Sequence, residues 1–159
     1  MEEIEIAKEL TKGLLERMGV RAEVDGYLKE GNLYLGIRGD QEGILIGKHG
    51  RNLEALQMLV NRMVNKRLKN AMRVVLDVDD YRKRRAESMA QMALRLGDEA
   101  KRTGQSQVAG LLNAYDRRII HVTLKEDPFL ETESIGEGEL KRVKIIPLKD
   151  RDNPLKRFE

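Results

Sequence analysis

Cysteine and tryptophan are absent from the 159-residue sequence, and histidine occurs only twice, at His49 and His121. The lack of cysteine excludes disulfides and thiolate metal sites and suits a reducing cytoplasm, which is the expected compartment. Two histidines are too few for a histidine-built metal centre, so we expect no metal and no cofactor. No apolar run approaches the length of a membrane-spanning helix, and the acidic, amphipathic first residues are unlike a signal peptide.

Aromatic residues make up only 4% of the chain. This scarcity argues against a platform on which bases stack on Phe and Tyr, so base contacts would rely on aliphatic or hydrogen-bonding groups. The net charge of +3 is unevenly distributed: residues 41–85 hold 11 basic and 5 acidic groups, whereas residues 1–40 hold 6 and 9. A basic zone on an otherwise balanced chain indicates a polyanionic ligand, although a solubilising surface is the simpler alternative.

The stretch Ile44–Arg51 combines an apolar tripeptide, two glycines and a basic pair, and it leads directly into a helical pattern. Gly47 and Gly50 would each weaken a helix interior by roughly 1 kcal/mol relative to alanine, but they let a bound backbone approach closely. A turn that opens a helix also presents free N–H groups, and Lys48 and Arg51 add positive charge. The pattern therefore predicts a phosphate-holding turn, with a packing corner between two helices as the open alternative.

Hydrophobic periodicity and the positions of Gly and Pro predict the remaining elements. In the first half these are a helix over 3–18, strands over 21–27 and 33–37, a short helix ending at Ile46, a helix over 51–68 and a strand over 73–78. In the second half they are a helix over 81–103, a strand over 106–110, a helix from Asn113 or Ala114 to about Lys125, and a hairpin of 131–135 and 141–146. The sequence thus predicts an α+β protein of two small two-layer domains, over 1–79 and 80–148, followed by a charged tail over 149–159.

Asp77, Asp79 and Asp80 form one acidic group between a predicted strand and a predicted helix. A metal or acid/base cluster is one interpretation of this group. A strand end followed by a helix cap explains the same residues better.

Arg117 and His121 are four residues apart and so share one helix face. Three interpretations remain open: a general base beside an anion-binding arginine, a pair that contacts a phosphate or a base edge, and a histidine that only forms local hydrogen bonds. Spacing alone favours the last. No serine, cysteine or acid is spaced to complete a catalytic set, so no catalysis is expected.

Residues 45–57 (Leu-Ile-Gly-Lys-His-Gly-Arg-Asn-Leu-Glu-Ala-Leu-Gln) resemble the Gly-x-x-Gly segment of a type II KH domain, whose order is helix–strand–strand–helix–helix–strand. Residues 113–121 (Asn-Ala-Tyr-Asp-Arg-Arg-Ile-Ile-His) resemble the signature of the R-three-H domain, an α/β domain with a small sheet and two helices. Two independent motifs in this order make the chain similar, over about residues 3–148, to the Jag family. These are SpoIIIJ-associated RNA-binding proteins of bacteria, also called KhpB.

The resemblance implies binding of single-stranded RNA, with single-stranded DNA as a second ligand, and a KH turn that holds the nucleic-acid backbone over about four nucleotides. By match, the contact residues are Gly47, Lys48, His49, Gly50 and Arg51 in the first domain and Arg117, Arg118, His121 and Arg142 in the second. The family also implies a small partner KH protein, a YidC-type membrane insertase, and post-transcriptional effects on cell elongation and division. Whether the chain forms a homodimer stays open, since some KH proteins pair through their Gly-x-x-Gly regions. Because the sequence starts at the first KH helix, the Jag-N domain that often precedes it is expected to be missing.

Two other functions stay open. A protein-interaction adaptor would pair its KH unit with a partner KH chain, and RNA binding would then be incidental. A nuclease or phosphatase that uses His121 is the weaker alternative.

Overall fold

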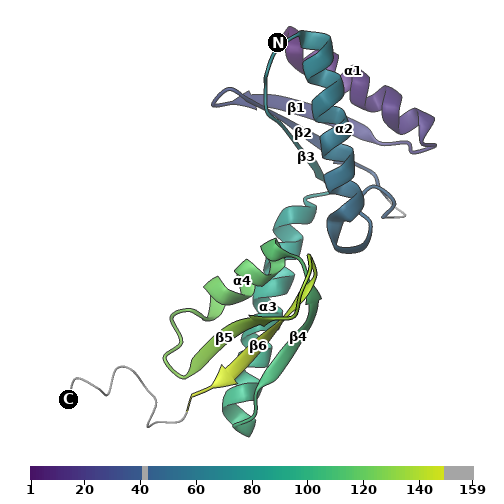
Figure 1. Cartoon of the computed structure of the whole chain (residues 1–159). Coiled ribbons are helices and arrows are strands. Elements are labelled where there is room, and N and C mark those ends of the chain that lie inside the picture. The colour runs from purple at the N-terminus through teal and green to yellow at the C-terminus, as the bar shows by residue number, and fades with distance from the viewer. Residues whose placement is uncertain (41–42, 149–159) are drawn as a thin grey trace. The chain divides into compact units, whose positions relative to one another are not determined.

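The structure is a computed structural model that describes residues 1–40 and 43–148. The chain divides into two compact units, Met1–Arg82 and Lys83–Glu159. The first unit is built from α1 (Glu2–Arg17), β1 (Glu23–Lys29), β2 (Asn32–Arg38), the short 3-10 helix η1 (Lys48–Gly50), α2 (Arg51–Leu68) and β3 (Val74–Val78). Then follow α3 (Tyr81–Thr103), β4 (Gln107–Leu112), α4 (Ala114–Leu124), β5 (Leu130–Ile135) and β6 (Lys141–Pro147). The predicted α+β class is confirmed (Figure 1).

The sheet of the first unit has the strand order β1-β2-β3, in which β1 and β2 are antiparallel and β2 and β3 are parallel. Alternate residues of each strand are buried on one face. Leu33, Leu35 and Ile37 of β2 pair in register with Val74, Leu76 and Val78 of β3, and all six are at most 2% exposed. α1 and α2 pack on this face and complete the core with side chains such as Leu15 and Leu53.

The hairpin between β1 and β2 closes through Glu30 and Gly31, which have φ angles of 51° and 76°. Two successive positive φ values are typical of the tight two-residue turn that suits the twist of antiparallel strands. Outside the segment before Gly47, the predicted bounds of the helices and strands agree with the structure to within two residues.

The predicted short helix ending at Ile46 is wrong for the part that the structure describes. Residues 43–46 form a bend and a turn, and the Gly47 amide donates to the Gly43 carbonyl at 3.0 Å. Gly43 has a φ of 68° and the Leu45 amide donates to the carboxylate of Asp40 at 3.0 Å, which favours a turn over a helix. Residues 41–42 lie outside the described residues.

The sheet of the second unit is antiparallel with the order β4-β6-β5. Val143 and Ile145 of β6 are fully buried against residues of α3 and α4 that include Ala93 and Ile120. Asn113 is the N-cap of α4, and its side chain accepts the Asp116 amide at 2.9 Å.

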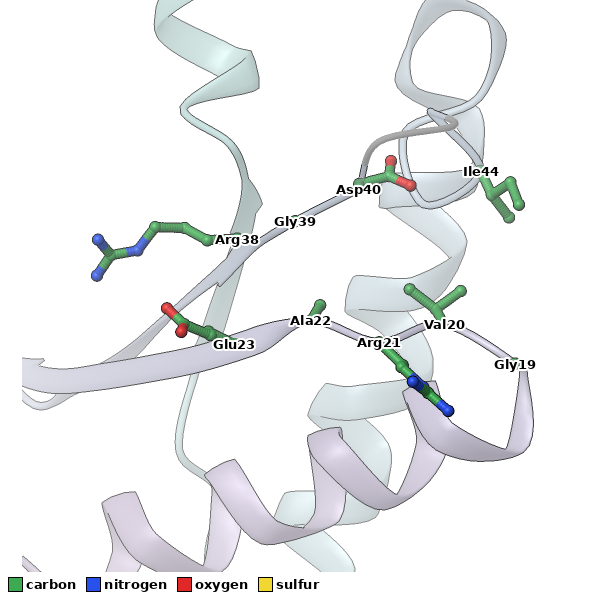
Figure 2. Close-up of a pocket in the computed structure, with 9 residues that line it drawn as sticks. All are labelled: Gly19, Val20, Arg21, Ala22, Glu23, Arg38, Gly39, Asp40 and Ile44. Carbon is green, nitrogen blue, oxygen red and sulfur yellow. The ribbon is translucent and has the colours of Figure 1, made fainter.

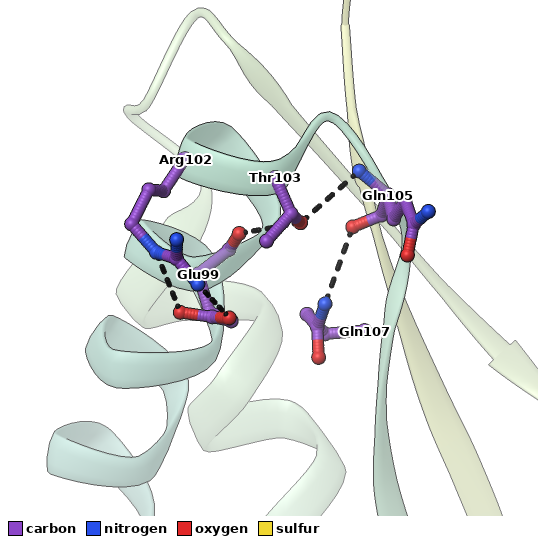
Figure 3. A network of polar contacts seen from close by, with 5 residues as sticks. All are labelled: Glu99, Arg102, Thr103, Gln105 and Gln107. Atoms are coloured by element: carbon purple, nitrogen blue, oxygen red, sulfur yellow. Dashed lines mark hydrogen bonds and ion pairs between the residues drawn. The ribbon is translucent and has the colours of Figure 1, made fainter.

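A polar network closes the C-terminal end of α3 (Figure 3). The Thr103 hydroxyl donates to the Glu99 carbonyl at 2.8 Å and accepts the Gln105 amide at 3.2 Å, while Arg102 makes two bonds to the Glu99 carboxylate. Gly104, with a φ of 68°, then turns the chain away towards β4. A left-handed glycine directly after the last turn is a common helix ending.

Candidate nucleic-acid interface

The turn between Gly47 and Gly50 has an unusual backbone. Gly47 has φ 69° and ψ −179°, which is accessible essentially only to glycine, and Gly50 is left-handed with φ 76°. His49 between them is also left-handed, with φ 57° and ψ 21°. Three of the four residues therefore have a positive φ, and the turn holds strain of a kind that concentrates at functional sites.

Both glycines are packed against the protein itself. A Cβ on Gly47 would lie 2.5 Å from Cγ of Asn52, and a Cβ on Gly50 would lie 2.9 Å from the ring of Tyr81. Gly50 is buried. The fold itself therefore fills the space that their side chains would take, and the close approach of a ligand to these glycines stays a prediction.

The amides at the start of α2 also find partners inside the turn. The Asn52 and Leu53 amides both donate to the Ile46 carbonyl, at 3.0 and 3.2 Å, and the Arg51 amide donates to the Lys48 carbonyl. The predicted free N–H groups of this first turn are therefore satisfied by the protein, and the positive charge of the turn comes mainly from side chains.

Lys48 and Arg51 are exposed, whereas His49 is half-buried. Aliphatic side chains before and after the turn are exposed as well: Ile44 is 47% exposed and Met58 is 72% exposed. The turn thus combines cations with aliphatic surface, which are the two components that the sequence predicted for an RNA contact with few aromatics.

A hollow of about 720 Å³ lies beside the residues that precede the turn (Figure 2). Its lining combines Ile44 with both charge signs, namely Arg21 and Arg38 with Glu23 and Asp40. The charges of these described residues balance, so this hollow attracts phosphates less than the turn with Lys48 and Arg51 does.

Side-chain amides of α2 cover the open edge of β3, a feature that the sequence analysis missed. Three of them, spaced four residues apart, accept alternate backbone N–H groups. The pairs are Gln57 with Leu76 at 3.0 Å, Asn61 with Val74 at 3.0 Å, and Asn65 with Met72 at 2.7 Å. The signal available in the sequence was the spacing of 57, 61 and 65, which places three amides on one helix face.

Arg82 extends this cover. Its Nη2 donates to Oε1 of Gln57 at 3.1 Å and to the Leu76 carbonyl at 3.4 Å, while its Nε is buried without a partner among the described residues. The edge of β3 is therefore closed to an added strand, and Arg82 was a second residue that the sequence analysis did not select.

In the second unit, Arg117 and His121 make contacts within the fold rather than projecting from it. The Arg117 Nη1 donates to the carbonyls of Leu112 at 2.8 Å and Glu139 at 3.1 Å. The His121 ring contacts the Thr132 hydroxyl through Nδ1 at 2.7 Å and the Ser134 hydroxyl through Nε2 at 2.9 Å. The pair thus links α4 to the strands beside it, which agrees with the local-bonding interpretation of His121.

Burial lowers the pKa of the His121 imidazole below its usual range, and the positive charge of Arg117 lowers it further. The ring is therefore neutral at pH 7. One ring nitrogen then donates and the other accepts, and the two hydroxyl groups can take either complementary role.

Arg118 and Arg142 lie differently with respect to this pair. Arg118 follows Arg117 on α4 and is exposed. Arg142 alternates along β6 with Val143, which is buried on the helix side of the sheet, so Arg142 points to the other face. The sheet therefore lies between Arg142 and His121, and the contact of Arg142 with a nucleic acid stays a prediction.

The acidic residues at the end of β3 have structural partners. The Asp79 carboxylate accepts the amides of Gly39 and Asp40, both at 3.1 Å, and Asp77 accepts the Arg82 amide at 3.5 Å. Over residues 1–40 and 43–148, no group of three or more His, Asp or Glu side chains is arranged to hold a metal ion. None of the helices in these same ranges is long and apolar enough to cross a membrane.

Comparison with protein families gives two matches. Residues 4–78 match the model of the KhpA/KhpB KH domain, and residues 87–147 match the model of the R-three-H domain. Together with the fold, these matches define a two-domain protein in which a KH domain precedes an R-three-H domain. Neither domain family is a family of enzymes.

Curated relatives are similar over most of the chain. The chain is 40% identical over 136 residues to the RNA-binding protein KhpB of Clostridium symbiosum, which covers 86% of this chain and 60% of that protein. It is 35% identical over 125 residues to the KhpB of Lactiplantibacillus plantarum, with 77% and 38% covered, and 29% identical over 144 residues to that of Bacillus subtilis, with 89% and 69% covered. The chain belongs to the KhpB family, as the resemblance predicted. It spans 60% or less of the length of the first two relatives.

Proposed function

We propose that this chain binds single-stranded RNA and that the turn between Gly47 and Gly50 contacts the phosphate backbone. The observation that carries the proposal is a strained, cation-bearing turn at the start of α2, within the segment that matches a KH domain. The relatives named RNA-binding protein KhpB support the same ligand class.

In this proposal the side chains of the turn supply the phosphate contacts. Lys48 and Arg51 are exposed cations one turn apart, and charge-assisted bonds to phosphate are among the stronger polar contacts that proteins make. Because the first amides of α2 bond within the turn, the helix backbone contributes only its dipole. Ile44 and Met58 supply aliphatic surface for bases next to the phosphates held at the turn.

The second unit would add cationic contacts. Among the described residues, only Nη1 of the Arg117 guanidinium makes a hydrogen bond, so its other N–H groups can meet a phosphate, and Arg118 is exposed beside it. His121 would hold α4 in place rather than touch RNA, because both of its ring nitrogens already have partners.

The test reverses charge at the turn. The double variant Lys48→Asp, His49→Asp should lower affinity for an RNA oligonucleotide by at least about tenfold and reduce the salt dependence of binding. For single strands, each phosphate contact contributes about −0.7 to the slope of log affinity against log salt concentration, so losing a contact makes this slope shallower. Lys69→Asp, an exposed position after the far end of α2, makes the same type of charge change and serves as the control. Unchanged affinity in the double variant with an unchanged circular dichroism spectrum would reject the proposal.

A protein-interaction adaptor is the second candidate, and exposed apolar residues on α2 favour it. Met58 is 72% exposed and Leu59 is 55% exposed, so adjacent residues of one helix present apolar surface to solvent. Co-purification of a partner KH protein that survives nuclease treatment would favour the adaptor, whereas loss of the partner with the RNA would favour RNA binding. Association with a membrane insertase and a role in cell elongation stay predictions from the family resemblance.

A further inference from the structure

The sheet of the first unit has a second face, opposite α1 and α2. Its residues alternate with the buried ones along each strand and stay half-buried or exposed. The pairing of the strands arranges them in rungs. Tyr27, Tyr34 and Val75 form one rung, and Asp25, Gly36 and Asp77 form the next. An apolar rung therefore lies directly beside an acidic one.

The two tyrosines form a stacked pair. Their ring centroids are 5.1 Å apart and the ring planes differ by 7°, yet Tyr27 remains 57% exposed. Stacking fixes the rings in place and leaves ring surface available. Tyrosine faces carry negative electrostatic potential and attract cations within about 6 Å of the ring centre.

A hollow of about 350 Å³ lies over the acidic rung, with Tyr27 at its border. Gly36 forms part of its lining, and a Cβ built on Gly36 would meet nothing within 4 Å. Since neighbouring strands are about 4.8 Å apart, Asp25 and Asp77 lie on strands roughly 10 Å apart with this bare glycine between them. The gap fits one side-chain head group between the two carboxylates.

The charge around the hollow is opposite to that of the turn at Gly47. Among the described residues, its lining contains Asp25, Asp77, Asp79 and Asp80 but only one cation, Arg38. Arg38 forms an ion pair with Asp25, and both side chains are more than half exposed. One guanidinium from the chain itself thus already binds at the rim, which shows the type of group that this surface accepts.

We propose that this face docks an arginine- or lysine-rich extended segment of a partner protein, with one basic side chain in the hollow over Gly36. The stem of that side chain would lie along Tyr27, and its charged head would reach Asp77. RNA fits this surface poorly, because the described lining holds four Asp residues and one Arg, and this excess of negative charge repels phosphates. The inference does not depend on the proposed RNA contact, which uses other residues.

The test fills the hollow without disturbing the core. Gly36→Val adds a β-branched side chain that suits a strand and enters open space. Gly110→Val is the matched control, because Gly110 is an exposed glycine of β4 in the other sheet and its Cβ would also meet nothing within 4 Å. Asp77→Asn removes charge while it keeps an oxygen for the Arg82 amide. The probe is a labelled synthetic peptide of alternating Arg and Gly, with a Glu-Gly peptide as its counterpart, and binding is read by fluorescence anisotropy.

Gly36→Val should weaken binding of the Arg-Gly peptide by about tenfold and Asp77→Asn by about fivefold, while Gly110→Val leaves it unchanged. The Glu-Gly peptide should not bind, and RNA affinity should be the same in all three variants. Equal peptide affinity in Gly36→Val and the unaltered protein would overturn the proposal. Loss of RNA affinity in Gly36→Val would also overturn it, because the face would then be a nucleic-acid surface.

Discussion

Replacing Gly47 with alanine tests whether this glycine serves the fold or the ligand. With φ 69° and ψ −179°, Gly47 lies in a region that costs other residues about 1–3 kcal/mol. The new Cβ would lie 2.5 Å from Cγ of Asn52, so the Asn52 side chain must move and give up its 2.8 Å bond to the Ile44 carbonyl. Losing that bond adds about 1 kcal/mol, so the expected destabilisation is about 2–4 kcal/mol.

Alanine substitutions at two other glycines of the first unit provide a comparison for the destabilisation expected of Gly47→Ala. Gly31 has φ 76° and open space around its Cβ position, so Gly31→Ala should cost only the backbone strain of about 1 kcal/mol. Gly50→Ala adds a 2.9 Å contact with the Tyr81 ring, whose edge can shift, so its cost should lie between the other two. The order of destabilisation should therefore be Gly47, then Gly50, then Gly31.

The assay is urea unfolding followed by circular dichroism, with RNA binding measured separately under folding conditions. Because the chain has two units, their transitions must be resolved before free energies are compared. If Gly47→Ala proves no more destabilising than Gly31→Ala, the packing argument fails. If Gly47→Ala abolishes RNA binding without lowering stability, Gly47 serves ligand binding rather than the fold.

Two further predictions concern the second unit. Asp116 is 1% exposed, and its carboxylate accepts hydrogen bonds from Nε and Nη2 of Arg85 at 3.0 and 2.6 Å. Asp116→Ala should therefore lower the free energy of unfolding, measured by urea denaturation, by roughly 3 kcal/mol. A loss as small as that of a surface substitution would contradict the role of this buried pair. Since the folded state holds His121 neutral, the unfolded state binds more protons below about pH 6.5, and stability should fall as the pH drops from about 7.5 to 5.5. His121→Gln should show a weaker pH dependence in the same denaturation series, and an identical dependence would refute the assignment.

Elements with strong local signals could be predicted from the sequence. The apolar spacing from Leu53 to Val64, together with the glycines before it, predicts α2, and the same reasoning finds α3 between Asp80 and Gly104. The helix predicted for the segment before Gly47 is wrong because its local signal was weak. Its three apolar residues suggested a helix, but the carboxylate of Asp40 and the left-handed Gly43 turn the chain there.

In the candidate site, too, local features could be predicted from the sequence and contacts between distant residues could not. The Gly-x-x-Gly segment and its cations are local features, so the sequence alone is enough to predict Lys48 and Arg51 as contact residues. The ring that covers Gly50 belongs to Tyr81, and the hydroxyls that hold His121 belong to Thr132 and Ser134. These partners are 11 to 31 residues away along the chain, and the hydrophobic periodicity of the sequence does not predict contacts over such separations.

The sequence by itself therefore determined the order of helices and strands, the family and the position of the basic zone, because these depend on residue type and on spacing within a few turns. Only the tertiary structure decided which polar groups remain available to a ligand. Each donor and acceptor bonds to whichever partner the fold brings near, so the amides of α2 and the ring of His121 are engaged within the protein, while Lys48, Arg51 and the ring of Tyr27 remain exposed.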